Sequence, residues 1–369
     1  MAQEQPCADR EAFFTPERFA REQARRMASP RGRLLIAGCR SGSFLSRRVA
    51  DRYDALLSES GSEERVLHLE DLDTRFANTE TCVRLAQHVS CYDVFLFQAL
   101  TDPTVEQTVD DNYVAFFIAA RTFREHGANH VTGVLPYLAY SRQDKPTKFT
   151  REPATAKLMA DLAVTAGIDR LIAWDPHCAQ IRGFYGNMPM NMLESLTLFI
   201  EEFERFRGRP DVIAVAPDVG ASKSITHFGR ALDLECAIAS KYRPRPDEAT
   251  ISQIIGDFTG KKVAIVLDDE ISTAGTLYAL SRKLVEETGI RELYLGASHC
   301  HCLPVARERL ESLRADFNLQ SVVVTNSIPQ TEEFVALPFF SVRCLSETLA
   351  RTINRIHYDR SVSEVFYRP

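Results

Sequence analysis

Short apolar runs, several of them rich in β-branched residues, recur along the chain, and stretches with helical spacing separate them. The runs predict strands at residues 33–38, 66–69, 93–98, 131–136, 171–174, 212–215, 263–267, 293–296 and 322–324. Helical spacing predicts helices at 43–53, 113–126 and 153–166, and Pro153 and Gly167 mark the start and the end of the last one. This strand–helix alternation predicts an α/β fold with doubly wound, parallel sheets.

The clearest strand–loop–helix unit spans residues 263–276. Its strand ends at two adjacent carboxylates, and a loop of small and hydroxylated residues leads into a segment with helical spacing. Carboxylates at such a strand end can bind sugar hydroxyls or a hard cation, and the free amides of a helix start favour a phosphate. We interpret the unit as a sugar-phosphate site formed by Asp268, Asp269, Ser272, Thr273, Ala274, Gly275 and Thr276. The alternative is a polar strand end with Thr276 as a helix cap.

Two polar segments follow predicted strands in the first half of the chain. Arg142 and Gln143 lie in the cluster 140–145, where they suit an anion and a base, and the alternative is a solvated loop. His177 follows Asp175 at another strand end, which suits a metal or phosphate site. A lone histidine is more often structural, so that alternative stays open.

Two further segments carry candidate chemistry in the second half. Asp218 follows the strand 212–215 and suits a magnesium ion, while the helix start beside it suits a diphosphate; a capped helix start explains the segment equally well. Lys241 and Arg243 lie in the proline-broken stretch 240–246, which we predict to be a loop. They suit the charge on a transferred phosphoryl group, and the alternative is a basic surface loop.

The pattern His299-Cys-His-Cys302 looks like a metal site at first sight. Alternate residues of a strand point to opposite faces of its sheet, so the four side chains do not easily converge on one ion. The sequence therefore does not favour zinc at this position.

Bulk properties narrow the class of protein. A chain of 369 residues exceeds what one core usually supports, so we expect two domains with a boundary near 191–194. The formal net charge of −6 argues against nonspecific nucleic-acid binding, and the chain has no apolar run long enough for a bilayer. Nine scattered cysteines fit reduced thiols in the cytoplasm. Residues 1–32 are charged without an apolar core, and we expect an extension rather than a secretory signal.

Taken together, these segments resemble the ribose-phosphate pyrophosphokinase family, the phosphoribosyl diphosphate (PRPP) synthetases. The resemblance runs from about Arg33 to the end, and its motifs occur in family order at 75–83, 142–144, 151–157, 174–184, 217–220, 241–243, 268–276, 326–329 and 361–366. It implies two phosphoribosyltransferase-like, doubly wound domains with parallel central sheets. We expect an ATP-side domain at 33–193, a ribose 5-phosphate-side domain at 194–352, and a tail at 353–369 that returns to the first domain.

The resemblance also implies an activity. Such an enzyme transfers diphosphate from Mg-ATP to the anomeric hydroxyl of ribose 5-phosphate, giving PRPP and AMP. It assigns ATP binding to Arg142, Gln143 and Asp144, and to Phe76, Asn78 and Glu80 from a neighbouring subunit of a dimer-based homo-oligomer, such as a hexamer. It assigns Mg²⁺ to His177 and Asp218, and catalysis to Lys241, Arg243 and His177. The residues of the sugar-phosphate site would bind ribose 5-phosphate. Neither nucleic acid nor membrane is an expected partner.

Three departures from the family pattern leave alternatives open. Ser272 stands where the family usually has an acid, Ala221 and Ser222 alter the glycine-rich diphosphate loop, and the stretch 142–157 is one residue longer than usual. These departures motivate a second hypothesis, a non-catalytic subunit that regulates an active synthetase. A third is a phosphoribosyltransferase that consumes PRPP, which shares the Asp-Asp loop but lacks the ATP-type segments.

Overall fold

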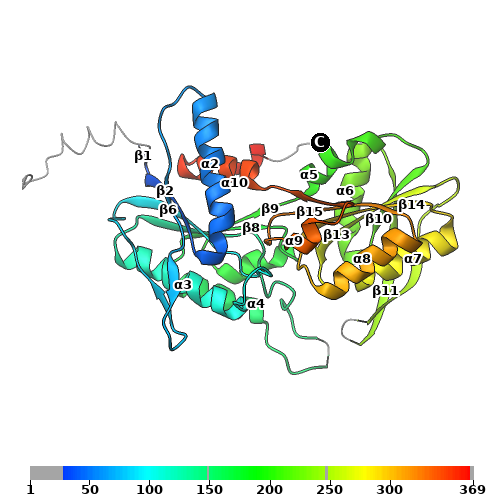
Figure 1. Cartoon of the computed structure of the whole chain (residues 1–369), viewed down its shortest axis with the longest axis horizontal. Helices are drawn as coiled ribbons and strands as arrows, with labels where there is room; N and C mark the ends of the chain where they lie inside the picture. The colour runs from blue at the N-terminus through cyan, green and yellow to red at the C-terminus, as the bar shows by residue number, and fades with distance from the viewer. Residues whose placement is uncertain (1–27, 148, 246–247, 366–369) are drawn as a thin grey trace, which may run out of the picture.

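The computed structural model describes residues 28–147, 149–245 and 248–365. In this part of the chain, two seven-stranded sheets lie side by side along the long axis, with helices on their faces (Figure 1). Most of the expected N-terminal extension, residues 1–32, lies outside the described residues. No helix of the described part is long and apolar enough to cross a bilayer.

The first sheet has the order β1-β2-β6-β7-β8-β9, with β3 paired to β2. Among the described strands of this sheet, every pairing is parallel except β1 with β2. The strand bounds are β1 Ala28–Ser29, β2 Gly32–Gly38, β3 Leu67–Leu69, β6 Tyr92–Phe97, β7 His130–Leu135, β8 Arg170–Trp174 and β9 Met190–Leu193. A separate hairpin consists of β4 Asp73–Arg75 and β5 Thr81–Val83.

Helices cover both faces of the first sheet. Leu35 and Ala37 of β2 pack into a cluster with α3 and α4, whereas Leu34 and Ile36 pack into a second cluster with α2 and α10. This division follows because alternate strand residues point to opposite faces. The helix bounds are α2 Ser43–Glu59, α3 Val109–Glu125, α4 Thr155–Ala166 and α10 Ser346–His357.

The second sheet has the order β12-β11-β10-β13-β14-β15-β16, and of its described pairings only β11 with β12 is antiparallel. Its strands are β10 Val212–Ala216, β11 Glu235–Arg245, β12 Glu248–Ile255, β13 Val263–Ile271, β14 Glu292–Cys300, β15 Leu319–Thr325 and β16 Phe340–Arg343. On one face lie α5 Leu196–Glu202 and α6 Ser222–Leu232, and on the other α7 Gly275–Thr288, α8 Pro304–Asp316 and α9 Glu332–Val335. The predicted doubly wound, parallel sheets are confirmed.

Two local predictions were wrong. We expected β13 to stop at Leu267, but it pairs with β14 as far as Ile271, so the carboxylates lie within the strand. We expected a loop at 240–246, but the described part of this stretch continues β11. Pro244 lies beyond the part of β11 that pairs with β10, which ends at Ile238. The pairing with β12 shifts register between Tyr242 and Arg245, and such an irregularity needs no regular donor at every position.

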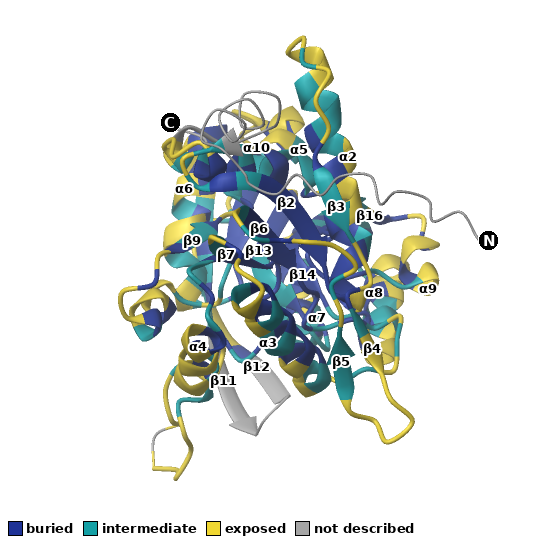
Figure 2. Cartoon of the chain, turned by 90° about the vertical axis from the view of Figure 1, so that its left-hand side faces the viewer, coloured by how far each residue is buried: buried dark blue, intermediate teal, exposed yellow. Residues whose placement is uncertain are grey.

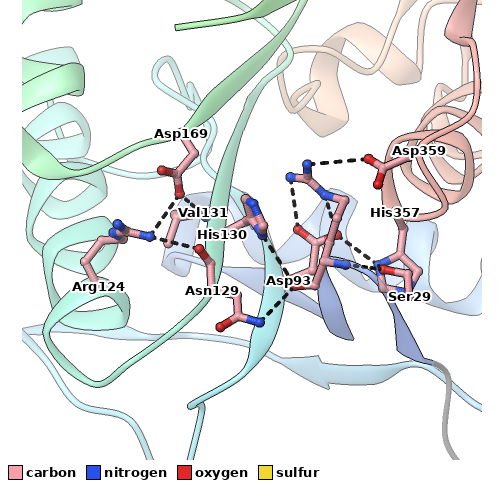
Figure 3. A network of polar contacts seen from close by, with 10 residues as sticks. Ser29, Asp93, Arg124, Asn129, His130, Val131, Asp169, His357 and Asp359 are labelled. Atoms are coloured by element: carbon pink, nitrogen blue, oxygen red, sulfur yellow. Dashed lines mark hydrogen bonds and ion pairs between the residues drawn. The ribbon is translucent and has the colours of Figure 1, made fainter. Parts of the chain in front are cut away.

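The C-terminal helix α10 returns to the first sheet and packs beside α2 (Figure 1). Figure 3 shows how a buried carboxylate of β6, Asp93, ties this return in place. Asp93 accepts hydrogen bonds from Arg31 Nε at 3.1 Å and His357 Nδ1 at 2.9 Å, and Arg31 also lies 3.8 Å from Asp359. Helix α10 itself begins at Ser346. The domain division at 193/194 and 352/353 stays a prediction.

Candidate active site at the carboxyl edges of the two sheets

The carboxyl ends of β7 and β8 in the first sheet meet those of β13 and β14 in the second. Just beyond β7, the Tyr137 ring lies edge-on to the rings of His299 and His301, with centroids 4.9 Å apart in both pairs. Just beyond β8, Asp175 accepts hydrogen bonds from the hydroxyl of Ser298 and the amide of Ser195. Ligands of open parallel sheets bind outside the carboxyl ends of strands, so this junction is the candidate site.

His177 and Asp269 form a direct pair across the junction. His177 Nδ1 lies 2.6 Å from Asp269 Oδ2. The hydrogen bond to Asp269 raises the pKa of His177 above its ordinary value, against the opposing effect of partial burial. Burial by itself would raise the pKa of Asp269, but the hydrogen bond and charge of His177 hold it well below its usual range. The predicted metal ligand and a predicted ribose ligand are thus neighbours.

Arg142 and Glu270 form a second pair across the junction. Arg142 Nη1 donates a hydrogen bond to Glu270 Oε1 at 2.6 Å, and His301 Nε2 lies 3.6 Å from the same oxygen. Burial by itself would raise the pKa of Glu270, but His301 and Arg142 lower it below its ordinary value. The sequence interpretation passed over Glu270, although it continues the acidic run Asp268-Asp269.

The sugar-phosphate loop joins β13 to α7. Ala274 adopts a left-handed conformation, with φ of 56°, and reverses the chain into the helix. Because the first amides of a helix have no partner within it, this turn presents donors suited to a phosphate. Arg309 of α8 holds the loop through a 2.7 Å hydrogen bond from Nη1 to the Thr273 carbonyl. Thr276 lies inside α7 and Ala274 is the N-cap, so the alternative of Thr276 as a helix cap is wrong.

The loop after β7 contacts the loop after β8. The Asp144 carboxylate accepts a hydrogen bond from the Cys178 thiol at 3.5 Å, next to His177. The carbonyl of Gln143 accepts from the Ala156 amide at 3.2 Å, which fixes the loop against the start of α4, while the Gln143 side chain is exposed. Arg142, Asp144 and His177 are therefore brought to one place from separate segments.

Asp218 is the N-cap of the short helix η4, Val219–Ala221, and its Oδ1 accepts from the Ala221 amide at 3.3 Å. The capped helix start that the sequence left open is thus present, and magnesium binding by Asp218 stays a prediction. Lys241 and Arg243 lie on β11, where the backbone of Lys241 pairs with Ile251. Their side chains lie outside the described part of the chain, so their catalytic role stays a prediction.

Phe76, Asn78 and Glu80 form the tip of the β4–β5 hairpin. The Phe76 side chain is half exposed, and Asn78 Nδ2 donates to Glu80 Oε2 at 2.9 Å. An ion pair of 2.6 Å from Arg75 to Asp111 fastens the hairpin to α3, and Figure 2 shows it extending outward beside that helix. Within the chain, the described contacts do not join this tip to His177 or Asp269.

The donor set suits a metal that arrives with a nucleotide. Among the described residues, no group of three or more His, Cys, Asp or Glu is placed to hold an ion by itself. Magnesium is usually held by one or two carboxylates together with waters and substrate phosphates. His177 and Asp218 offer one imidazole and one carboxylate, donors of the kind that such a site uses, and their joint binding of magnesium stays a prediction.

The His299-Cys-His-Cys302 segment alternates as predicted. His299 and His301 face the junction, whereas Cys300 and Cys302 pack into the core between the second sheet and α7 and α8. His299 Nδ1 lies 2.7 Å from Ser327 Oγ, and its Nε2 lies 3.2 Å from the Asp175 carbonyl. The two imidazoles thus help to join the halves of the molecule, a role the sequence pattern did not reveal.

Comparison with known proteins agrees with this geometry. Residues 35–167 match the family described as the N-terminal domain of ribose phosphate pyrophosphokinase, and residues 213–367 match the phosphoribosyl synthetase-associated domain. The ribose-phosphate pyrophosphokinase of Clostridium acetobutylicum is 36% identical over 293 residues, covering 79% of this chain and 88% of the relative. The chain belongs to the ribose-phosphate pyrophosphokinase family.

Other members of the ribose-phosphate pyrophosphokinase family support the assignment. The enzyme of Vibrio parahaemolyticus is 31% identical over 323 residues, covering 87% of this chain and 95% of the relative. The crystal structure of phosphoribosylpyrophosphate synthetase from Mycobacterium smegmatis superimposes with a TM-score of 0.75 and 28% identity, covering 88% of this chain and 99% of that one. The family resemblance and the fold predicted from sequence are confirmed.

Proposed function

We propose that this chain is a ribose-phosphate diphosphokinase, which transfers diphosphate from Mg-ATP to ribose 5-phosphate and releases PRPP and AMP. The observation that carries the proposal is the pair of contacts His177–Asp269 and Arg142–Glu270. In each contact, one residue lies in a loop that the family resemblance assigns to ATP or its magnesium. The other residue lies on β13, the strand that leads into the sugar-phosphate loop. The relatives named ribose-phosphate pyrophosphokinase support the same activity.

On this proposal, the second sheet binds the acceptor. Asp268 and Asp269 accept hydrogen bonds from ribose hydroxyls, and the amides of residues 272–276 bind the 5-phosphate at the start of α7. The two ends of the sugar are then fixed by one strand–loop–helix unit. Fixing the sugar in this way holds its anomeric hydroxyl in position for attack.

The reaction forms a bond from the anomeric oxygen to the β-phosphorus of ATP and breaks the bond from that phosphorus to the oxygen that leaves with AMP. Charge spreads over the nonbridging oxygens in such a transfer, so cations stabilise it most. Lys241 and Arg243 supply this charge from β11, and Arg142 supplies it from the first sheet. Magnesium carried by ATP supplies further neutralisation when it is held by His177 and Asp218.

The finer partner assignment is a homo-oligomer whose active site is completed by Phe76, Asn78 and Glu80 of a neighbouring subunit. The exposure of Phe76 at an outward hairpin supports it. Mixing two variants tests it: Phe76→Ala and Lys241→Ala carry defects on different subunits of a shared site. Partial recovery of activity in the mixed oligomer is expected, and no recovery after verified subunit exchange contradicts sharing.

Release of AMP and PRPP from ATP, ribose 5-phosphate and Mg²⁺ is the direct test of the activity. We expect both products in equal amounts from the protein alone. Well-folded protein that releases no AMP at saturating substrate overturns the proposal. We also propose a cytoplasmic location, which the free thiols of the eight described cysteines support.

A second candidate, a non-catalytic regulatory subunit, is favoured by Ser272 and by the synthetase-associated description of the C-terminal match. That candidate predicts activity only in a mixture with a second, active synthetase. Activity of the protein alone excludes it, so the same AMP assay, run with and without an active family member, separates the two functions.

A further inference from the structure

Glu270 lies at the centre of the junction, yet the proposed chemistry gives it no role. Its side chain is 8% exposed, whereas that of its partner Arg142 is 43% exposed. Arg142 comes from the loop after β7 and Glu270 from β13, so the pair joins the two sheets. A buried carboxylate of the second sheet therefore holds an exposed guanidinium in the loop that is assigned to ATP.

The surroundings of Glu270 fix its position. Its backbone pairs with His299 of the adjacent strand, and His301 Nε2 lies 3.6 Å from its carboxylate. The Tyr137 ring packs edge-on against both imidazoles. Glu270 is thus held by a strand and by neighbouring rings, and the carboxylate that faces Arg142 has little freedom to move.

The contact leaves Arg142 able to bind a second anion. A guanidinium has five N–H donors in a rigid fork, and the hydrogen bond to Glu270 uses the Nη1 end. A long arginine side chain loses rotamer freedom when it binds a ligand, and a partner that already orders it lowers this cost. The geometry therefore favours an ordering role for Glu270 over simple neutralisation.

We propose that Glu270 is a positioning residue for ATP: from the ribose-binding half, it orients Arg142 so that the remaining guanidinium donors meet the nucleotide phosphates. This inference rests on the proposed function, because that function places ATP beside Arg142. It makes the ATP site dependent on a residue of the opposite sheet. It also gives Glu270 a role different from that of Asp268 and Asp269, which the proposed function assigns to the ribose hydroxyls.

A double-mutant cycle tests the inference. Dissociation constants for ATP are measured by calorimetry without ribose 5-phosphate, for wild type, Glu270→Ala, Arg142→Ala and the double variant. Glu270→Ala is expected to weaken ATP binding about tenfold, and Glu270→Gln, which keeps an acceptor oxygen, about threefold. In the Arg142→Ala background, Glu270→Ala is expected to have no further effect, because its role acts through Arg142.

Steady-state constants add a readout that a purely structural role does not produce. The KM for ATP is expected to rise in Glu270→Ala while the KM for ribose 5-phosphate stays within twofold of wild type. A matched control is Glu202→Ala, which removes a largely buried carboxylate of α5 from its ion pair with the exposed Arg343; the described contacts of Glu202 do not include Arg142, His177, Asp269 or Glu270. This control should leave both KM values unchanged.

Three results of the binding measurements overturn the inference. ATP binding is unchanged in Glu270→Ala, or it is tighter, which would make Glu270 a competitor for Arg142. The third result is that the losses of the two single variants add in the double variant. An equal rise of both KM values also overturns it, because that pattern indicates general disruption of the strand. Failure of the proposed function looks different, since wild type itself would then neither bind ATP nor release AMP. If Glu270→Ala fails to fold, Glu270→Gln provides the same comparison.

Discussion

The two halves of the molecule share an architecture, but in both ion pairs between Arg142, His177 and β13 the cation comes from the first half and the carboxylate from the second. Each half is a seven-stranded sheet with one antiparallel pairing at its edge. The first sheet brings the cationic groups Arg142 and His177 to the junction, whereas β13 of the second brings Asp269 and Glu270. Cations suit nucleotide phosphates and carboxylates suit sugar hydroxyls, so this polarity agrees with the proposed division into an ATP side and a ribose 5-phosphate side.

The halves also differ in how they are closed. The first sheet depends on the returning helix α10, which the buried Asp93 fastens to Arg31 and His357 (Figure 3). The second sheet instead ends in the hairpin of β11 and β12, which carries Lys241 and Arg243. The helix that covers the first sheet thus serves stability, while the edge hairpin of the second sheet carries residues assigned to catalysis. Variants at the two kinds of position should therefore separate stability from activity.

The largest expected effect is on stability, at Asp93. Asp93→Ala leaves the buried Arg31 and His357 side chains without their shared carboxylate, and breaking such a buried cluster costs about 3–5 kcal/mol. We expect a lower urea midpoint for the transition that reports the first sheet. Glu347→Ala is the matched control, because Glu347 also joins α10 to α2, through Arg52, but at the surface. The control should lose at most about 1 kcal/mol, and equal losses in both variants would contradict the role of the buried network.

The next effect is on activity, at Asp269. Asp269→Asn keeps the shape of the side chain but removes the charge that accepts hydrogen bonds most strongly. The expected loss in kcat/KM for ribose 5-phosphate is about 100-fold, measured as AMP release. Asp257→Asn, an exposed carboxylate in the loop before β13, is the control and should retain full activity. If only the KM for ATP rises in Asp269→Asn, Asp269 acts on ATP and its assignment to ribose 5-phosphate is contradicted.

A smaller effect is the pH dependence of the His177–Asp269 pair, which joins the two halves. The pKa of His177 is raised and that of Asp269 lowered by their pairing in the metal-free protein. The histidine contribution to stability is complete below its unfolded pKa of about 6.5 and is lost as the pH rises through the folded value. The aspartate contribution is present above about pH 4 and is lost as the pH falls. The pair therefore stabilises the junction most between about pH 4 and 6.5.

Titration of His177 by NMR in the presence of EDTA checks this prediction. We expect its pKa to lie above about 6.5 in wild type and to fall in Asp269→Asn, because the hydrogen-bonding charge is removed. The exposed control variant Asp257→Asn should leave the pKa of His177 as it is in wild type. A His177 pKa that the substitution leaves unchanged would contradict the pairing.

The strands and helices were largely predictable because their signals are local. Core residues such as Leu35 and Ile36 alternate between two faces, and a run of apolar residues shows this without knowledge of neighbours. The end of β13 was not predictable, because Asp269 and Glu270 stay in the strand by pairing with β14, and no propensity of the acidic residues indicates it. The β11–β12 hairpin was missed for a similar reason, since Pro244 argues locally for a loop.

The sequence predicted a site residue only where that residue stands in a motif of the family. His177, Arg142 and Asp269 stand in motifs, whereas Glu270, Tyr137 and His301 acquire a role only when the two sheets meet. The contacts Arg142–Glu270 and Tyr137–His301 join residues more than one hundred positions apart in the chain, and a single sequence does not show such pairs. The acidic run after Leu267 was the one local signal, and it was interpreted only as far as Asp269.

The smallest expected effect tests whether the ribose-binding half works with a hydroxyl in place of a carboxylate. Ser272 lies between the end of β13 and Ala274, where the family resemblance expects an acid. If the loop is a working ribose site, Ser272→Asp adds a stronger acceptor and should keep or raise AMP release, by no more than about fivefold. Ser272→Ala, which removes the hydroxyl, is the matched comparison and should lower it slightly. A collapse of activity in Ser272→Asp alone would mean that Ser272 is adapted to a different ligand in this half, while the cationic half remained that of an ATP-binding enzyme.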